Sequence, residues 1–571
     1  MEMSGAHIVW ECLRREGVDT VFGYPGGNVL SLYDALQDFP SIRHVLTRHE
    51  QGACHMADGY ARAGGRTGVV LATSGPGATN LVTGLATAMM DSVPLVAITG
   101  QVGSAVLGTD AFQEVDFMGV TLPITKHNYL VQRAEDIGPA MREAFAIASH
   151  GRPGPVVVDI TRDAQKGRAE LDWDAIPCTR HLRHLPPRPE RGLLDQALGL
   201  IRWARQPLIL AGHGVILSGA IRELRTFAER TGAPIATTLL GIGAVPASHP
   251  LNLGMMGMHG EAWVNQAIQE ADLILALGMR FDDRVTGELA SFAPRARKIH
   301  VEVDACELNK NIPVDVAIHA DLREVLTALL PELEPQDHAG WQAHLGALRG
   351  HAGAEAILED HGSLSGPQVI HELCRATQGR ALVVTDVGQH QMWEAQYYRH
   401  ETENSLITSG GLGTMGFALP AGIGAKLACP EREVWVIVGD GGFQMNMQEL
   451  MTLVQEGVKI NIAVINNGFL GMVRQLQEFF CERRYAAVTM ANPDFVKLAD
   501  AFGVPGLRVD ARAGVAAAIQ LARDTEGPFL IEFQVEKELS VYPMVPSGAS
   551  LGEMLRRNRN EPAALEEPAE R

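Results

Sequence analysis

The sequence has little cysteine, no long apolar run and no excess of positive charge. Its seven cysteines are scattered over 571 residues and form no C-x-x-C pair, so we expect reduced, mostly buried thiols rather than a disulfide framework. No run of 18 apolar residues occurs, so we expect no membrane span. The formal net charge of −19 gives a general nucleic-acid-binding role no electrostatic support. Residues 1–4 lead into an amphipathic segment that lacks the features of a secretory signal, so we expect a cytoplasmic protein.

The length suggests three or four domains with an ample core. Apolar runs that end in glycine or an acidic residue alternate with helical patterns, which predicts an α/β protein of three doubly wound parallel sheets. The basic, proline-rich segment 180–192 and the segment 335–367, rich in Gly, Ala and His, are interpreted as linkers. We therefore expect domains at 1–165, 190–335 and 366–548, followed by a charged tail at 549–571.

The stretch 433–467 carries the clearest functional pattern. An apolar run ends in Gly439-Asp440-Gly441, a helical pattern follows, and a second apolar run ends in Asn466-Asn467. This order predicts a strand, a glycine turn, a helix and a second strand of one parallel sheet. Ligands bind at the carboxyl edge of such sheets, where Asp440 and Asn467 would lie. One carboxylate and one amide oxygen suit Mg²⁺, and the glycines let backbone N–H groups approach a diphosphate.

The alternative is an ordinary strand–helix–strand unit with a chance Asp and Asn. The 27 positions from Asp440 to Asn467 make the pattern more specific, and it resembles the thiamine-diphosphate fold motif. This resemblance implies that Asp440, the Asn467 side chain and the backbone carbonyl of Phe469 hold Mg²⁺, which anchors the diphosphate of the cofactor.

The N-terminal part repeats the same plan of strands followed by glycine turns or polar segments. One such segment, Arg48-His49-Glu50-Gln51-Gly52-Ala53, follows a predicted strand at 42–46. Thiamine diphosphate needs one carboxylate from the protein, which protonates its pyrimidine ring, and Glu50 is the candidate. The alternative is a solvated glutamate that caps the following helix.

Further motifs occur along nearly the whole chain. They lie at 23–27 (GYPGG), 74–80 (SGPGATN), 108–114 (GTDAFQE), 151–155 (GRPGP), 257–260 (GMHG), 280–284 (RFDDR), 386–393 (DVGQHQMW), 409–420 (SGGLGTMGFALP) and 541–546 (VYPMVP). Together with the patterns around Glu50 and Asp440, they resemble the catalytic subunit of acetohydroxyacid synthase (acetolactate synthase). That family condenses two 2-oxoacids in branched-chain amino-acid synthesis, with release of CO₂ from the first.

The resemblance implies roles on the thiamine-diphosphate side of the site. Glu50 would be the activating glutamate, and Met415 would be the apolar wedge that holds the cofactor bent. The alternative for Met415 is an ordinary core methionine. The remaining contacts with this cofactor would be Pro76, Asn80, Val387, Gly388, Gln389, His390, Gly413, Gly439, Gly441, Gly442, Leu470 and Gly471.

The resemblance also implies roles on the substrate side. Gly26 and Gly27 would offer backbone N–H groups to a developing oxyanion, and Phe112 and Gln113 would shape the acceptor pocket. Arg284 would clamp the carboxylate of the second substrate or pack near a flavin. Its alternative is a surface ion pair with one of the two aspartates that precede it.

The middle domain resembles the FAD-binding domain of the same family. It has no full G-x-G-x-x-G, so its glycines alone are a weak signal. The reaction needs no net redox step, so this FAD would be structural. The matching contacts are Arg152, Gly212, Gly214, Thr237, Leu239, Met258, His259, Gly278, Arg280, Asp304 and Asp321.

Two positions depart from the family pattern. Arg162 stands where the family commonly has lysine, so a planar fork replaces a point charge near the substrate. Leu476 stands where many members carry tryptophan, whose ring narrows the acceptor pocket and favours 2-oxobutyrate over pyruvate. Leucine offers less contact area and no flat wall, so we expect a weak preference between the two acceptors. The alternative for Leu476 is a plain core residue on a helix.

Two competing functions remain to be weighed. One is an FAD-free catabolic acetolactate synthase or another thiamine-diphosphate 2-oxoacid decarboxylase or oxidase, against which the segments 257–260 and 280–284 argue. The other is a non-catalytic binding subunit, against which the presence of Glu50, Asp440 and Asn467 argues. The resemblance further implies a homodimer or a dimer of dimers that shares each site between subunits, and it leaves a small regulatory subunit open.

Overall fold

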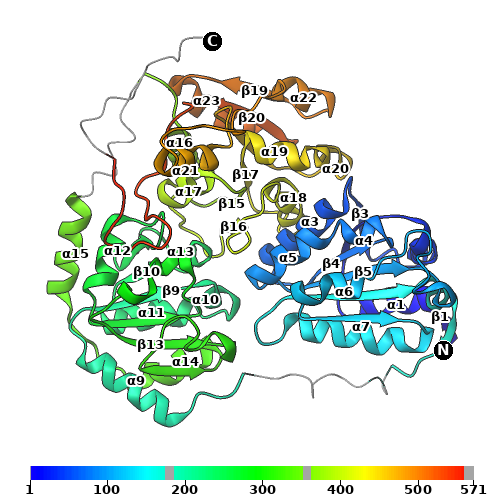
Figure 1. Cartoon of the computed structure of the whole chain (residues 1–571), viewed down its shortest axis with the longest axis horizontal. Coiled ribbons are helices and arrows are strands. Elements are labelled where there is room, and N and C mark those ends of the chain that lie inside the picture. The colour runs from blue at the N-terminus through cyan, green and yellow to red at the C-terminus, as the bar shows by residue number, and fades with distance from the viewer. Residues whose placement is uncertain (1, 174–175, 177–185, 352–361, 558–571) are drawn as a thin grey trace.

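The computed structural model describes residues 2–173, 176, 186–351 and 362–557. These residues form three domains, each built on one six-stranded parallel sheet (Figure 1). The predicted fold class is therefore confirmed. Residues 180–185 of the linker predicted at 180–192 lie outside the described residues.

The N-terminal sheet has the strand order β3-β2-β4-β5-β7-β6. Its central strands are buried along their whole length, which is why they are apolar runs rather than alternating patterns. The strands are β2 (Thr20–Tyr24), β3 (Arg43–Leu46), β4 (Gly68–Ala72), β5 (Leu95–Gln101), β6 (His127–Val131) and β7 (Pro155–Thr161), beside a small pair of β1 (Glu2–Ser4) and β8 (Arg168–Glu170). The helices are α1 (Gly5–Arg15), α2 (Leu30–Ala35), α3 (Glu50–Gly64), α4 (Pro76–Thr79), α5 (Val82–Asp91), α6 (Phe117–Thr121), α7 (Ala134–Ser149) and α8 (Arg162–Lys166).

The C-terminal sheet has the order β16-β15-β17-β18-β20-β19, which repeats the N-terminal order strand for strand. The expectation of two domains with one architecture is therefore confirmed. The strands are β15 (Leu382–Thr385), β16 (Leu406–Thr408), β17 (Val434–Gly439), β18 (Asn461–Asn466), β19 (Gly506–Val509) and β20 (Phe529–Gln534). The helices are α16 (Gly366–Thr377), α17 (Gln389–Tyr397), α18 (Ala418–Ala428), α19 (Asp440–Asn446), α20 (Leu450–Gln455), α21 (Gly471–Phe480), α22 (Phe495–Ala501) and α23 (Arg512–Asp524).

The middle sheet has a different order, β11-β10-β9-β12-β13-β14. Strand β9 lies beside β12 at the centre. From β9 to β11 each new strand is added toward one edge of the sheet, and from β12 to β14 toward the other edge, as in dinucleotide-binding sheets. The strands are β9 (Pro207–Ala211), β10 (Ile235–Thr237), β11 (Asn252–Met255), β12 (Leu273–Leu277), β13 (Arg297–Glu302) and β14 (Val316–His319). The helices are α9 (Arg191–Trp203), α10 (His213–Leu217), α11 (Ile221–Thr231), α12 (Ala262–Glu270), α13 (Asp283–Thr286) and α14 (Leu322–Leu329).

Two segments differ from the expectation. The first, predicted as a linker at 335–367, contains helix α15 (Ala339–His351), in which Trp341 and Leu345 are buried one turn apart. The Trp341 indole donates a hydrogen bond to the Pro207 carbonyl at 3.1 Å. The second is the start of the predicted tail: Leu551 is buried against the middle domain, and Ala549 accepts the N–H of Glu288. Both segments pack against the middle domain. The burial of a few apolar side chains holds them there, although most of their residues are small or polar.

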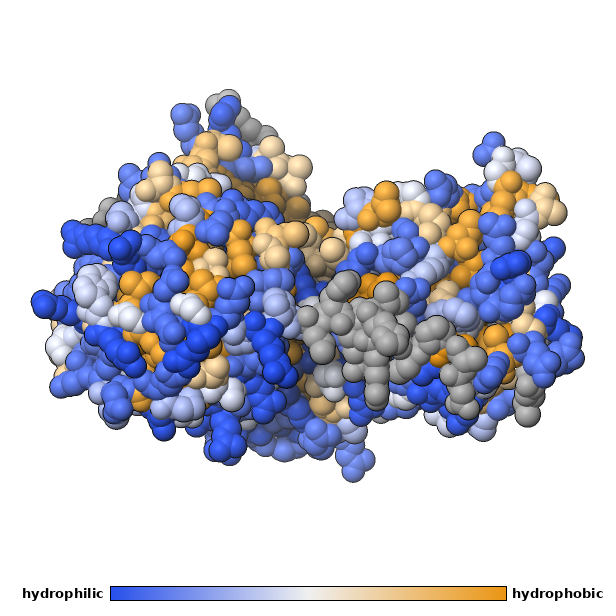
Figure 2. Space-filling view, turned by 90° about the horizontal axis from the view of Figure 1, so that it is seen from below, coloured by the Kyte–Doolittle hydropathy of each residue, from blue (hydrophilic) through white to orange (hydrophobic). Residues whose placement is uncertain are grey.

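Helices α3 and α18 lie side by side and join the N-terminal and C-terminal domains (Figure 1). The contact is close because Gly59 and Gly424 each face the backbone of the other helix, where no side chain would fit. Seen from below, the middle and N-terminal domains form two lobes with a hollow between them (Figure 2). Within the described ranges, no helix combines the length and the apolar character that crossing a membrane requires.

Candidate active site

The predicted metal ligands lie at the carboxyl ends of two neighbouring strands. Asp440 follows β17 and Asn467 follows β18, and both side chains are buried. Asp440 Oδ2 accepts a hydrogen bond from Asn492 Nδ2 at 2.7 Å. Asn467 Nδ2 donates to Gln389 Oε1 at 3.3 Å, while its Oδ1 accepts the N–H of Phe469 at 3.1 Å. The Asn467 amide is thus turned so that its oxygen, the atom that binds a metal, points away from Gln389.

The surroundings of Asp440 fit a magnesium ion. Burial raises the pKa of this carboxyl to about 6, against hydrogen bonds from Asn492 and nearby backbone N–H groups that lower it. A buried carboxylate of this kind is stabilised when a cation binds beside it. Among the described residues, no group of three or more His, Cys, Asp and Glu side chains converges. The donors at hand are one carboxylate and neutral oxygens, which suits Mg²⁺ with water and phosphate in its other positions. The role of the Phe469 carbonyl stays a prediction.

The side chains of Gln389 and His390 hold the turns around this edge. Burial lowers the pKa of His390 to about 4, and its Nε2 accepts the N–H of Gly439 at 3.3 Å. A side chain at Gly388 or Gly439 would meet the His390 ring at 2.9 Å. Gln389 Nε2 donates to Gln475 Oε1 and to the Leu539 carbonyl, each at 2.9 Å. Both residues therefore position the predicted diphosphate site, and their direct contact with a diphosphate stays a prediction.

The loop 409–417 links β16 to α18 and carries Gly413 and Met415. The buried carboxylate of Asp386 accepts the N–H groups of Gly416 and Ala418, each at 3.0 Å. Met415 reaches Gly441, where a side chain would come within 3.4 Å of its methyl carbon. Gly441 also faces Leu470, and Gly442 faces Asp386. The loop and the metal-binding edge are therefore in contact, as the predicted cofactor site requires.

The N-terminal sheet positions the second group of predicted residues. Glu50 is the first residue of α3, is buried, and accepts a hydrogen bond from Asn80 Nδ2 at 2.9 Å. A side chain at Gly77, next to Pro76, would come within 3.2 Å of Glu50 Oε1. A side chain at Gly75, on the other side of Pro76, would meet the backbone of Gln113 at 2.9 Å. A side chain at Gly26 would meet Thr73 at 2.5 Å, and Gly27 follows it. The structure brings these predicted residues to one edge of the sheet.

Among the described residues, no hydrogen bond joins Glu50 to Asp440, and each belongs to its own half-site. The hydrogen bond of Glu50 runs to Asn80 and that of Asp440 to Asn492, each inside its own domain. Large apolar side chains are exposed on both domains: Phe112 of the N-terminal domain is 88% exposed. Others include Tyr24, Leu30 and Leu122 on the N-terminal domain, and Leu412, Met445, Val473 and Phe480 on the C-terminal domain.

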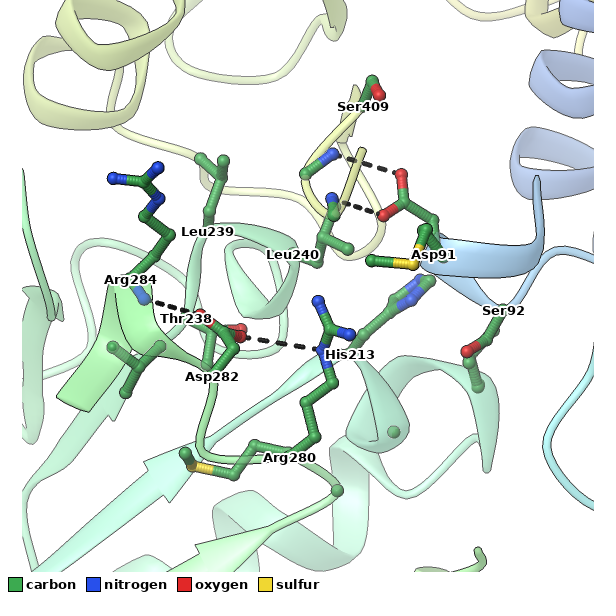
Figure 3. A pocket seen from close by; sticks show the side chains of 18 of the residues that line it. Asp91, Ser92, His213, Thr238, Leu239, Leu240, Arg280, Asp282, Arg284 and Ser409 are labelled. Atoms are coloured by element: carbon green, nitrogen blue, oxygen red, sulfur yellow. Dashed lines mark hydrogen bonds and ion pairs between the residues drawn. The ribbon is translucent and has the colours of Figure 1, made fainter. Parts of the chain in front are cut away.

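A cavity of about 690 Å³ opens between all three domains (Figure 3). This size lies in the usual range of small-molecule sites. Of the residues predicted to contact FAD, Gly212, Thr237 and Asp304 do not line it, whereas Arg152, Gly214, Leu239, Met258, His259, Gly278, Arg280 and Asp321 do. Its wall also includes Val387, Gly388, Gly413, Met415, Arg284 and Leu476. The cavity therefore runs from the predicted flavin site to the loop 409–417.

Two observations fit a flavin in this cavity. His259 lines it, and its buried Nδ1 has no hydrogen-bond partner among the described residues, which is uncommon for a buried polar atom. Gly214 and Gly278 (φ 61°) approach each other so closely that a side chain at either would meet the other at 2.6 Å. Such glycines let a ligand lie directly on the ends of β9 and β12.

The predicted substrate residues are placed as follows. Helix α21 turns Arg474 and Gln475 into the protein, where Gln475 Oε1 accepts the N–H of Val541 at 2.7 Å. Leu476 is 40% exposed and lines the cavity instead. Arg284 also lines it; its guanidinium lies 3.1 Å from the Met258 sulfur and 3.6 Å from an Asp283 oxygen. Arg162 is exposed at the end of β7 and does not line the cavity.

Sequence reasoning missed Asn492, which supports Asp440. Asn492 donates to Asp440 Oδ2 and to Asn466 Oδ1, at 2.7 and 3.0 Å, and accepts from Gln444 Nε2 at 2.9 Å. It stands in a loop 52 positions after Asp440, beyond α21. No local pattern marks it, since an Asn-Pro pair is also a common turn signal.

Comparisons with known proteins agree with this geometry. Family models of thiamine pyrophosphate enzymes match residues 3–120 (N-terminal TPP binding domain), 194–329 (central domain) and 386–533 (C-terminal TPP binding domain). The acetolactate synthase large subunit of Mycobacterium tuberculosis is 48% identical over 567 residues, which cover 97% of this chain and 91% of that protein. The acetolactate synthase isozyme 2 large subunit of Escherichia coli is 46% identical over 559 residues, 97% of this chain and 100% of its own. A chloroplastic acetolactate synthase of Nicotiana tabacum is 44% identical over 567 residues, 96% of this chain and 85% of its own.

Proposed function

Since the chain belongs to the acetolactate synthase large subunits, we propose that its two half-sites bind thiamine diphosphate and Mg²⁺ between them. The protein joins pyruvate to a second 2-oxoacid and releases CO₂. With pyruvate as acceptor the product is 2-acetolactate, and with 2-oxobutyrate it is 2-aceto-2-hydroxybutyrate, in the synthesis of valine, leucine and isoleucine. The observation that supports the site most directly is the pair Asp440 and Asn467 at the ends of β17 and β18.

Each half-site has its own task in this proposal. Thiamine diphosphate, when bound, supplies the carbanion chemistry of the reaction. Asp440 and Asn467 hold Mg²⁺ and thereby the diphosphate, and Met415 supports the cofactor from the loop 409–417. Glu50, shielded from water and held by Asn80, keeps a proton at the pyrimidine ring. The N–H groups of Gly26 and Gly27 face the developing oxyanion, where donors fixed in advance lower the barrier.

The acceptor substrate enters through the cavity between the three domains. Arg284 offers a cation to its carboxylate, and Leu476 forms an apolar wall beside it. Phe112, Gln113 and Arg162 do not line this cavity within their own chain, and we propose that they reach the acceptor from the N-terminal half-site of a second chain. We place FAD in the part of the cavity lined by the middle domain, as a structural group. Purified protein should then be yellow, and active colourless protein that takes up no FAD would favour the FAD-free catabolic branch.

The complete site requires two chains in this proposal. The exposed apolar side chains around Phe112 and around Met445 would cover each other in a two-fold symmetric pair. Each pair would then contain two sites, both made of one N-terminal and one C-terminal half. Inactive Glu50→Ala chains mixed with inactive Asp440→Ala chains should regain some activity, because one intact site can form. No recovery after verified subunit exchange would contradict the shared site.

We further propose a small regulatory subunit and a cytoplasmic location. The relatives from Mycobacterium tuberculosis and Escherichia coli carry the words "large subunit" in their names, which supports a smaller partner for this chain. Co-purification of a tagged chain from its own cells, with mass spectrometry of the bound proteins, tests the partner.

The function is tested by product analysis. Pure protein is incubated with pyruvate, Mg²⁺ and thiamine diphosphate, and the product is identified by NMR. We expect acetolactate, and we expect none when thiamine diphosphate is omitted or when Asp440→Ala replaces the wild type. Acetaldehyde, or an oxidised two-carbon product, would support the decarboxylase or oxidase alternative instead.

A further inference from the structure

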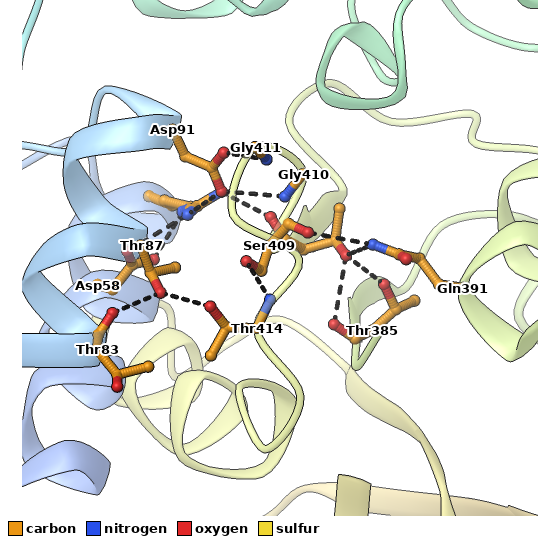
Figure 4. Close-up of polar contacts among 12 residues, drawn as sticks. Asp58, Thr83, Thr87, Asp91, Thr385, Gln391, Ser409, Gly410, Gly411 and Thr414 are labelled. Carbon is orange, nitrogen blue, oxygen red and sulfur yellow. Dashed lines mark hydrogen bonds and ion pairs between the residues drawn. The ribbon is translucent and has the colours of Figure 1, made fainter. Parts of the chain in front are cut away.

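A buried carboxylate of the N-terminal domain holds a loop of the C-terminal domain. Asp91 is the last residue of α5, and its side chain is 0% exposed. Its Oδ1 accepts the N–H of Gly411 at 2.7 Å and its Oδ2 accepts the N–H of Gly410 at 3.1 Å (Figure 4). These two glycines lie at the start of the loop 409–417, whose later residues include Met415.

Arg62 on α3 completes the buried charge cluster. It donates to Asp91 at 2.9 Å, to Asp58 at 2.6 Å and to the Thr408 carbonyl at 2.9 Å. Two carboxylates against one guanidinium leave one negative charge in excess, and buried charge needs compensation. The N–H groups of Gly410 and Gly411 supply hydrogen bonds to Asp91, whereas Asp58 has no hydrogen bond with the loop among the described residues. The loop is therefore part of what stabilises the Asp91 charge.

A second tie comes from the same face of α5. Thr87, one turn before Asp91, shares a hydrogen bond with Thr414 at 2.7 Å, and Thr414 N–H donates to Ser409 Oγ at 3.0 Å. Thr87 and Asp91 stand four positions apart, so they lie one above the other on the helix. Helix α5 therefore contacts both the beginning and the middle of the loop.

The beginning of the loop has little free space. A side chain at Gly411 would meet Asp91 Oδ1 at 2.9 Å, and one at Gly410 would meet Leu240 of the middle domain at 2.7 Å. The end of the loop is held by Asp386 of its own domain, through Gly416 and Ala418. Two buried carboxylates thus hold the loop by hydrogen bonds. Asp91 of the N-terminal domain binds its start, and Asp386 of the C-terminal domain binds its end, next to Met415.

We propose that Asp91 is a positioning residue: through Gly410 and Gly411 it fixes the loop 409–417 across the domain boundary and thereby places Met415 against the cofactor. This inference rests on the proposed function, which assigns Met415 to the thiamine-diphosphate site. Gln391 holds only the strand end before the glycines, by hydrogen bonds to Thr408 and Ser409. Without Asp91, the residues between Ser409 and Thr414 lose their restraint from the neighbouring domain.

The test compares Asp91→Asn with Asp58→Asn. Both variants remove one buried negative charge from Arg62 and keep the side-chain volume. Only Asp91→Asn also places an amide N–H group against the glycine donors, so only it should loosen the loop. In apoprotein, backbone hydrogen exchange of peptides that cover 409–417 should be about tenfold or more faster in Asp91→Asn than in Asp58→Asn, the factor expected for a lost hydrogen bond to a charged group.

The second measurement concerns the cofactor. With Mg²⁺ in excess, Asp91→Asn should bind thiamine diphosphate about tenfold more weakly and lower kcat, while the KM for pyruvate changes less. Asp58→Asn should stay within about twofold of the wild type in both, even if the two variants lose the same thermal stability. If Asp91 only stabilised the fold, Asp91→Asn and Asp58→Asn would change thiamine-diphosphate affinity and kcat by similar factors.

Several results would overturn the inference. Equal exchange of the loop in the two variants would show that Asp91 does not hold it. Faster exchange with unchanged thiamine-diphosphate affinity and turnover would show that the loop position does not matter to the cofactor. If wild-type protein does not bind thiamine diphosphate, the proposed function fails, and the exchange experiment alone still decides whether Asp91 restrains the loop. If Asp91→Asn does not fold, Thr87→Val takes its place, because it removes the hydrogen bond to Thr414 without changing a buried charge. Hydrogen exchange of the loop 409–417 should then be about threefold faster than in wild type. Unchanged exchange would show that helix α5 does not restrain the loop.

Discussion

The N-terminal and C-terminal domains share one strand order and differ in what they carry at the same edge. In the N-terminal domain, the edge holds Glu50, which accepts a hydrogen bond from Asn80. In the C-terminal domain, the edge holds Asp440 and Asn467 within a network of amide side chains. The shared topology provides the location of the site, and the loops after the strands provide its chemistry.

The difference in support indicates a difference in task. Asp440 is held in place by Asn492, and Asn467 by Gln389, so this half can receive a ligand without rearrangement. Glu50 accepts a hydrogen bond from Asn80, and in our proposal its carboxyl group acts on the pyrimidine ring of the cofactor. Substitutions in the C-terminal half should therefore affect binding, and those at Glu50 should affect chemistry.

The largest effect is expected from Glu50→Gln. The amide keeps the size and the hydrogen-bonding capacity of the side chain but cannot supply the proton. Hydrogen–deuterium exchange at the reactive carbon of thiamine diphosphate should slow about 10²-fold or more, the usual scale for proton-transfer groups. Thiamine-diphosphate affinity, measured by calorimetry on the same preparation, should change only slightly. Exchange at the wild-type rate would remove Glu50 from the reaction.

The second-largest effect is expected from Asp440→Ala, which should weaken cofactor binding rather than slow proton transfer. The substitution removes the only anionic ligand proposed for Mg²⁺, so both the metal and thiamine diphosphate should bind more than about 10²-fold more weakly, beyond the loss of about 10- to 100-fold for a merely supporting residue. Calorimetry with each ligand in turn measures this. Unchanged affinity for thiamine diphosphate would show that the metal site lies elsewhere, and the contrast between the two halves would disappear.

The sequence predicts the half-sites better than the network around them. Strand ends are visible because buried parallel strands are apolar runs and ligand-binding turns follow them, so Asp440, Asn467 and Glu50 could be chosen. Helix α15 was missed because two buried residues, Trp341 and Leu345, stand in a segment of glycine, alanine and histidine. Asn492 and Asp91 were missed because their partners are far away in the sequence or in another domain. Such contacts depend on tertiary packing and leave no local pattern.

A smaller effect is expected from Asn492→Ala. The residue touches Asp440 without binding the metal itself in our proposal, and supporting residues of metal ligands typically change affinity about 10- to 100-fold. Magnesium affinity in the presence of thiamine diphosphate should fall about tenfold. Gln444→Ala is the matched control, because Gln444 bonds to Asn492 and to the Asp440 carbonyl but not to its carboxylate. Equal losses in both variants would mean that the loop, rather than the bond to Asp440, is what counts.

The smallest effect concerns the acceptor pocket, where the two halves meet. Leu476 on α21 is 40% exposed and lines the cavity, which argues against an ordinary core position. Its neighbours Arg474 and Gln475 fix the helix from the buried side, so a larger side chain at 476 would extend into the cavity without disturbing the helix. A flat ring there would narrow the space and add contact with one more methylene of the acceptor.

Competition between pyruvate and 2-oxobutyrate therefore measures what Leu476 contributes. One methylene in a snug apolar pocket is worth about 1–3 kcal/mol, and a looser pocket gives less. Wild type should discriminate weakly, with acetolactate as a main product, and Leu476→Trp should shift the product ratio toward 2-aceto-2-hydroxybutyrate by about tenfold. Leu476→Met, similar in volume and without a ring, should leave the ratio near that of wild type. Strong 2-oxobutyrate preference in wild type, or an unchanged ratio in the tryptophan variant, would place acceptor selection on the N-terminal side, at Phe112 and Gln113.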